Sequence, residues 1–253
     1  MPEQGGAGAA GDIERSLADH LRVCADRGGV IADDLWLWIE DLDGPAPPWV
    51  TEGGGLDAAE RARLARLPTG LARARLLRGR GLLRAALAGP LGCTPGAVRL
   101  EVGPGGRPAL IGPGPSFNLS HSGRWLVLAV ALPRGGQAPA AVGVDVEQGP
   151  ALGESSLLTR FGDDVQRVVF TDVERAWVGA APDPGAAALR LWTRKEAALK
   201  AVGAGLRLPA QALEAHRGAL RWGPGLRALD GAWRLIERPL PEGGWCTIAA
   251  RGG

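Results

Sequence analysis

The chain of 253 residues has no tyrosine, one methionine and three cysteines. Cys24, Cys93 and Cys246 are far apart and odd in number, so they match neither a disulfide framework nor a zinc site. Free cysteines of this kind favour a reducing compartment, and we expect a cytoplasmic protein. The missing tyrosine accompanies 40 glycines and 20 prolines. We attribute much of this composition to coding bias, so a single glycine is a weak signal.

A strong net charge and a long apolar run are also missing. The net charge of +2 is too small to indicate nucleic-acid binding by itself. The longest clean apolar run, residues 125–132, is far too short to cross a bilayer. Residues 1–12 are rich in glycine and alanine and lack a basic segment followed by an apolar core. We therefore expect no membrane segment, no targeting segment and a loose tail over residues 1–12.

The apolar fraction of 45% is enough to build a core, in one domain or in two small ones. Turn-forming residues 133–140 mark the best boundary, which predicts an N-terminal half over 13–136 and a C-terminal half over 137–253. Hydrophobic periodicity, helix-breaking residues and a capping box at Thr171–Glu174 predict the elements. We expect strands at 35–39, 98–102, 125–132, 142–147 and within 220–250, and helices within 56–87 (broken at Pro68 and Gly70), from 171, and over 186–202.

Residues 142–147, Val-Gly-Val-Asp-Val-Glu, alternate with the period of a strand. Asp145 and Glu147 therefore share one face, about 6.6 to 7 Å apart along the strand. Two carboxylates that close repel each other unless a positive charge lies between them, and Mg²⁺ prefers such oxygen ligands. Gly143, on the same face, is expected to leave room for a ligand. The alternative is an ordinary solvated strand face.

The two helices predicted within residues 56–87 carry a surplus of arginine. Nearby acidic partners are few, namely Asp57 and Glu60. The surplus fits either a solvated basic face or an anion site for phosphates or an acidic protein. The arginines are Arg61, Arg63, Arg66, Arg73, Arg75, Arg78, Arg80 and Arg84.

Two further stretches carry candidate functional side chains. In residues 117–123, Phe-Asn-Leu-Ser-His-Ser-Gly, an extended chain directs His121 away from Ser120 and Ser122, which argues against a Ser-His nucleophile pair. On the predicted helix 186–202, Trp192, Glu196 and Lys200 are four residues apart and form one stripe. The alternative for Glu196 and Lys200 is a common surface salt bridge, which contributes only about 0.3 to 0.5 kcal/mol.

These three motifs, in this order and at this spacing, resemble the 4′-phosphopantetheinyl transferases, specifically the larger surfactin-synthetase type. The last motif reads Trp-Thr-Arg-Lys-Glu-Ala-Ala-Leu-Lys and ends in Gly-Ala-Gly-Leu at residue 206. The resemblance implies an α+β fold of two similar α/β halves with pseudo-twofold symmetry and the active site in the cleft between them. It also implies transfer of the phosphopantetheine arm of coenzyme A to a carrier-protein serine, with release of adenosine 3′,5′-bisphosphate.

The resemblance assigns the acidic and catalytic residues. Asp145 and Glu147 match the family's ligands for Mg²⁺, which Mn²⁺ can replace. Glu196 matches the third acidic position, either as a metal ligand or as the base that takes the serine proton through a water. Lys200 matches a lysine that contacts the phosphate and stabilises the developing charge.

The resemblance also assigns coenzyme A contacts. His121 matches a phosphate-binding histidine, and Ser120 stands beside it. Arg107 replaces the lysine of a Gly-Lys-Pro motif, which keeps the charge but changes its geometry. Arg75 matches a basic position near the nucleotide. For the 3′-phosphate we choose Arg66; the alternatives are Arg61 and Arg63.

The expected partners are coenzyme A and an acyl or peptidyl carrier protein of polyketide or nonribosomal peptide biosynthesis. We expect a monomer that binds neither nucleic acid nor membrane. One alternative is a metal-dependent phosphohydrolase that uses the same acidic residues. Another is a non-enzymatic nucleic-acid-binding module, with steep salt dependence. The basic helices lack the interleaved aromatics of a single-strand binder, so this module ranks last.

Overall fold

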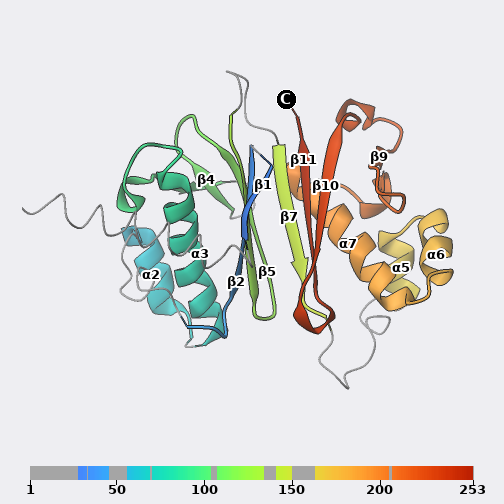
Figure 1. Ribbon diagram of the computed structural model, residues 1–253, viewed down its shortest axis with the longest axis horizontal. Coiled ribbons are helices and arrows are strands. Elements are labelled where there is room, and N and C mark those ends of the chain that lie inside the picture. The colour runs from blue at the N-terminus through green and yellow to red at the C-terminus, as the bar shows by residue number, and fades with distance from the viewer. Residues whose placement is uncertain are drawn as a thin grey trace, which may run out of the picture. The chain divides into compact units, whose positions relative to one another are not determined.

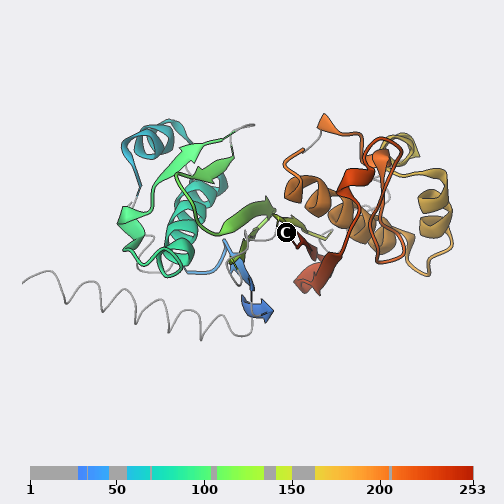
Figure 2. The same ribbon diagram turned by 90° about the horizontal axis from the view of Figure 1, so that it is seen from above.

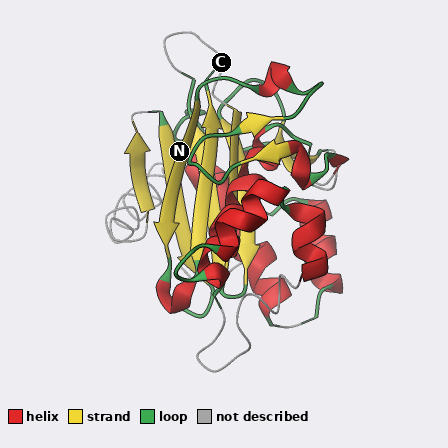
Figure 3. Cartoon of the chain, turned by 90° about the vertical axis from the view of Figure 1, so that its right-hand side faces the viewer, coloured by secondary structure: helices red, strands yellow, loops and turns green. Residues whose placement is uncertain are grey.

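The computed structural model describes residues 28–32, 34–45, 56–68, 70–103, 107–133, 141–149, 163–204 and 207–252. The chain divides into two compact units, residues 1–115 and 116–253. Helices and strands are mixed, with the strands in several sheets, which confirms the α+β class (Figure 3). The predicted tail, residues 1–12, and most of the predicted linker lie outside the described residues. The predicted halves, 13–136 and 137–253, and their pseudo-twofold relation stay predictions.

The first unit contains a strand hairpin, two helices and a short two-stranded ribbon. The two predicted helices are present, and local chemistry sets their limits. Asp57 and Glu60 form a capping box at the first helix, and Gly70, with a φ of 100°, separates it from the second. The elements are β1 (Gly28–Ala32), β2 (Leu35–Asp41), α2 (Ala58–Arg66), α3 (Leu71–Ala88), η3 (Pro95–Ala97), β3 (Leu100–Val102) and β4 (Pro108–Leu110).

Three arginines of α3 are structural. Arg80 and Arg84 reach the two carboxylate oxygens of Glu60, at 3.0 and 2.9 Å. Arg78 lies 3.3 Å from Glu40 and donates to two main-chain carbonyls. All three side chains are buried. The interpretation of the whole arginine set as one solvated or anion-binding face is therefore wrong for these three, because carboxylates and main-chain carbonyls already bind their guanidinium groups.

In the second unit, helix α7 packs on a three-stranded antiparallel sheet of order β10-β11-β7 (Figures 1 and 2). A hairpin of β5 and β6 belongs to the same unit, and β5 lies along β7. The elements are β5 (Ser116–Ser122), β6 (Trp125–Ala131), β7 (Ala141–Glu147), α5 (Asp163–Val169), α6 (Asp172–Gly179), α7 (Pro184–Ala201), η6 (Ala210–Ala212), β8 (Leu213–Glu214), β9 (Arg221–Trp222), η7 (Arg227–Leu229), β10 (Trp233–Pro239), η8 (Pro241–Gly243) and β11 (Trp245–Arg251).

Helix starts in this unit follow local signals. The predicted capping box of α6 is confirmed, since Thr171 and Glu174 each accept the other's backbone N–H. The Asp183 side chain caps α7 by accepting the backbone N–H of Ala186, without a reciprocal bond, and Pro184 takes the first position. Helix α5 was not predicted, because three of its seven residues are valines, which have a low helix propensity. No helix in the described part of the chain is both long and apolar enough for a bilayer.

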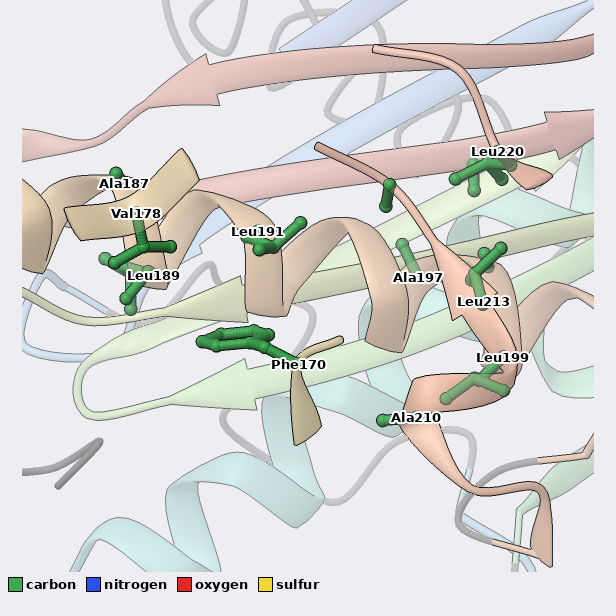
Figure 4. Packing of buried hydrophobic residues seen from close by; sticks show 14 of the residues in the cluster. Phe170, Val178, Ala187, Leu189, Leu191, Ala197, Leu199, Ala210, Leu213 and Leu220 are labelled. Carbon is green, nitrogen blue, oxygen red and sulfur yellow. The ribbon is translucent and has the colours of Figure 1, made fainter. Parts of the chain in front are cut away.

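Close packing holds α7 against β7. Side chains from α7, such as Leu191 and Leu199, join Phe170 and Leu213 in a buried apolar cluster (Figure 4). A Cβ atom at Gly143 would lie 2.0 Å from the carbonyl oxygen of Ala197. The interpretation that Gly143 leaves room for a ligand is therefore wrong, because the helix backbone takes that space.

Candidate functional site

A pocket of about 310 Å³ opens in the second unit, where β5, β7 and α7 meet. A volume of this size suits part of a small ligand. Six predicted site residues come together here: Ser120, His121, Asp145, Glu147, Glu196 and Lys200. The other lining residues are Leu119, Val146 and Trp192.

Alternate side chains of β5 reach across to β7. Asn118 accepts the backbone N–H of Val144, so it satisfies a main-chain donor between the strands. Two residues further, the Ser120 hydroxyl donates to Asp145 Oδ1 at 3.1 Å. Strand alternation thus turns the polar side of this segment toward the carboxylates. His121 alternates with Ser120 and Ser122 along the strand, is exposed, and also lines the pocket.

Asp145 is 4% exposed and lies beside Lys200, whose Nζ is 2.5 Å from Oδ1 and 2.9 Å from the hydroxyl oxygen of Ser120. Burial raises the pKa of Asp145 to about 6; Lys200 opposes the rise, and Glu147 and Glu196 add to it. Among the described residues, Oδ2 of Asp145 is buried without a hydrogen-bond partner. That oxygen is suited to receive a ligand that is itself a donor or a cation.

Both carboxylate oxygens of Glu147 accept a hydrogen bond. Trp192 donates its indole N–H to Oε1 at 3.3 Å, and Ser122 donates its hydroxyl to Oε2 at 2.7 Å. These two contacts come from different elements, α7 and β5. Sequence reasoning placed Trp192 on the stripe of Glu196 and Lys200 but did not assign it or Ser122 a role. The alternation of residues 118–122 was the available signal for Ser122.

Lys200 is not used as the surface partner of a helix salt bridge. Its amine bonds to Asp145 on β7 and Ser120 on β5. Trp192, Glu196 and Lys200 all line the pocket, so the predicted stripe on α7 is confirmed as a shared face. The pocket therefore combines three acidic side chains with one ammonium group.

The donor set fits a hard divalent cation in part. In the described ranges, no group of three or more histidine, cysteine, aspartate or glutamate side chains is arranged to hold a metal ion. Mg²⁺ commonly takes one or two carboxylates and completes its shell with water and substrate phosphates. Asp145, with its buried Oδ2, and Glu147 on the same strand face match that pattern. The metal site stays a prediction, with Asp145 and Glu147 as ligands and Glu196 as a third.

The three predicted arginines belong to residues 1–115. Arg66 is the exposed last residue of α2, and Arg75 is a half-buried residue of α3. Arg107 is half-buried and directly precedes β4. Their contacts with coenzyme A stay predictions.

Comparison with known proteins places the chain in a family. The sequence model of the 4′-phosphopantetheinyl transferase superfamily matches residues 141–234, which carry the acidic residues and the lysine of the pocket. The 4′-phosphopantetheinyl transferase HetI of Nostoc sp. is 32% identical over 230 residues, 88% of this chain and 90% of the relative. The chain belongs to the 4′-phosphopantetheinyl transferase superfamily.

Other members of the superfamily match shorter stretches. A phosphopantetheinyl transferase of Thraustochytrium sp. is 36% identical over 183 residues, 67% of this chain and 61% of the relative. A holo-[acyl-carrier-protein] synthase of Jannaschia sp. is 36% identical over 87 residues, 34% of this chain and 58% of the relative.

Proposed function

We propose that this chain transfers the 4′-phosphopantetheine group of coenzyme A to a serine of an acyl or peptidyl carrier protein. Adenosine 3′,5′-bisphosphate is the other product. The observation that carries the proposal is the pocket in which Asp145, Glu147, Glu196 and Lys200 converge, in a chain of this superfamily.

The reaction forms a bond between the serine oxygen and the phosphorus nearer the pantetheine and breaks that phosphorus's bond to the bridging oxygen of the pyrophosphate. The serine gives up its proton, and the leaving bisphosphate takes the bond electrons. Such transfers depend on positioning and on charge neutralisation more than on covalent chemistry by the protein. Glu196 either takes this proton through a bound water or ligates the cation. The Lys200 ammonium, already near Asp145 and Ser120, stabilises the charge on the phosphate oxygens.

A divalent cation completes the proposed site. Asp145 and Glu147 would hold Mg²⁺, with Mn²⁺ as a substitute, and Glu196 is the third candidate ligand. The bound cation supplies positive charge against the pyrophosphate. The support is the buried Oδ2 of Asp145 together with a second carboxylate on the same strand face.

The finer features of the proposal rest on the resemblance of the three motifs to the surfactin-synthetase type. That resemblance implies two similar halves with pseudo-twofold symmetry and coenzyme A contacts by His121, Ser120 and the arginines. A cytoplasmic location, expected from the free cysteines, and a monomeric state complete the proposal. A role in polyketide or nonribosomal peptide biosynthesis belongs to the same proposal.

The proposal is tested by the intact mass of an apo acyl carrier protein after incubation with this chain, coenzyme A and Mg²⁺. We expect a gain of one phosphopantetheine, and no gain with a chelator or with a carrier whose serine is changed to alanine. Asp145→Asn should slow the reaction at least about a hundredfold, the usual cost of losing such a group. Asp164→Asn, at an exposed position of α5, is the matched control. Release of inorganic phosphate without any gain in carrier mass would instead identify a phosphohydrolase.

A further inference from the structure

The Ser122 hydroxyl, at the end of β5, lies between Glu147, the last residue of β7, and Gln148, which follows that strand. The Ser122 oxygen is 2.7 Å from Oε2 of Glu147 and 3.2 Å from the backbone nitrogen of Gln148. A backbone N–H can only donate, and an ionised carboxylate can only accept. The single hydroxyl hydrogen of Ser122 is therefore directed to Glu147. The Gln148 N–H donates to the same oxygen and polarises the hydroxyl toward the carboxylate.

The opposite oxygen of the same carboxylate is held from the helix. Trp192 on α7 donates its indole N–H to Oε1 of Glu147 at 3.3 Å. The terminal torsion of a glutamate is broad, so a free carboxylate samples many orientations. One donor on each oxygen, from two different elements, restricts that rotation. Ser122 makes the shorter of the two bonds.

The turn that follows Ser122 is itself fixed to Gln148, the residue after β7. Gln148 accepts the backbone N–H of Arg124 at 2.8 Å. Gly123, between Ser122 and Arg124, has a φ of 52°. A Cβ atom at Gly123 would lie 1.5 Å from the side-chain oxygen of Gln148. Glycine is thus needed for both the backbone conformation and the close approach. The position of the Ser122 hydroxyl is set by this turn.

We propose that Ser122 is a positioning residue, whose hydroxyl orients the Glu147 carboxylate and thereby sets the affinity of the site for its divalent cation. This inference rests on the proposed function, because it takes Glu147 as a cation ligand. Ser122 acts through Glu147 and needs no contact with substrate or cation. Partners that orient metal ligands typically contribute about 10- to 100-fold in affinity or activity.

The test measures Mn²⁺ binding to the full chain by electron paramagnetic resonance, with coenzyme A present. Ser122→Ala should raise the Mn²⁺ dissociation constant about 10- to 100-fold. Ser122→Thr keeps the hydroxyl and should stay within a few-fold of the parent protein. Ser116→Ala, at the start of the same strand, is the matched control and should bind Mn²⁺ unchanged.

A second measurement distinguishes a misoriented Glu147 carboxylate from a folding defect. In carrier modification, Ser122→Ala should raise the Mg²⁺ concentration needed for half-maximal rate, with most of kcat recovered at saturating Mg²⁺. A structural defect would instead lower kcat at every Mg²⁺ concentration and lower the thermal unfolding midpoint. If Ser122→Ala does not fold, Ser122→Cys takes its place, because it keeps the volume with a weaker donor.

Unchanged Mn²⁺ affinity in folded Ser122→Ala or Ser122→Cys would overturn the inference. So would a loss in Ser122→Thr as large as the loss in Ser122→Ala, or a parent chain that binds no Mn²⁺. If the parent binds Mn²⁺ with the expected Ser122 effect but does not modify a carrier protein, the proposed function fails and the inference stands. If the carrier is modified but changing Ser122 has no effect on Mn²⁺ affinity, the inference about Ser122 fails and the proposed function stands.

Discussion

At the residue scale, a buried lysine of α7 is paired with a buried carboxylate. Lys195 is fully buried, 2.6 Å from Glu174, and also donates to the carbonyls of Ala210 and Leu213. Burial lowers the pKa of Lys195, and Glu174 opposes that change. Its neighbour in sequence, Glu196, faces the pocket instead. Of these two adjacent residues of α7, Lys195 lies in the core and Glu196 lines the pocket.

Glu237 on β10 should make the stability of the fold depend on pH. Burial alone would raise its pKa, but hydrogen bonds from Arg194, at 3.0 and 2.9 Å, and from Arg190 leave the pKa below the ordinary value of 4.5. A depressed carboxyl pKa stabilises the fold above the unfolded value, and this stability is lost as the pH falls through the folded pKa. Glu237→Gln should therefore unfold more easily at pH 7, by about 2 kcal/mol, because charged hydrogen bonds are lost.

Urea unfolding at neutral pH and below pH 4 checks this. The difference between the parent and Glu237→Gln should shrink as the pH falls through the lowered folded-state pKa of Glu237, below which the side chain is protonated in both states. Asp164→Asn removes an exposed pair with Arg167 and should cost under about 0.5 kcal/mol. A pH-independent loss in Glu237→Gln would mean that packing, and not the charge, matters at this position.

At the scale of elements, the contact between α7 and β7 joins stability to the site. A Cβ at Gly143 would lie 2.0 Å from Ala197 O and 2.4 Å from Ala201 N, both in the backbone of α7. Gly143→Ala should therefore push the helix away and destabilise the protein by about 1 to 3 kcal/mol, as overpacking does. Carrier modification should fall as well, because α7 carries Glu196 and Lys200.

Thermal unfolding and carrier modification measure the two effects together. Gly179→Ala, at the end of α6, is the control, since no atom lies within 4 Å of the added Cβ there. A Gly143→Ala protein as stable and as active as the Gly179→Ala protein would show that the helix tolerates displacement.

At the scale of the whole molecule, features that depend on local signals could be predicted from the sequence. Features that depend on contacts between elements could not. The capping box at Thr171–Glu174 and the break at Pro68 and Gly70 act within a few residues, so the sequence was enough to predict those helix ends. The capping box of Asp57 and Glu60 is equally local but was not predicted. The acidic strand and the stripe on α7 were visible as period and spacing. The roles of Ser122 and Trp192 were not, because they depend on β5 and α7 both reaching β7. Gly143 was misread for the same reason.

In the first unit, several arginines already have partners within the protein. Arg78, Arg80 and Arg84 are committed to carboxylates, and Arg61 donates to the carbonyl of Leu56. Arg61 and Arg66 are both exposed, so the carbonyl bond of Arg61 is what favours Arg66 as the contact for the 3′-phosphate of coenzyme A.

Arg66→Ala should weaken coenzyme A binding about tenfold, the scale of one charged hydrogen bond, and leave dephospho-coenzyme A unaffected. Arg75→Ala and Arg107→Ala should weaken both ligands, if they contact phosphates shared by the two. Titration calorimetry on the full chain measures this, with the exposed Arg99→Ala as the control. Unchanged binding of coenzyme A in all three variants would show that these arginines are surface charge, and would leave phosphate recognition to His121, Ser120 and Lys200 of the pocket.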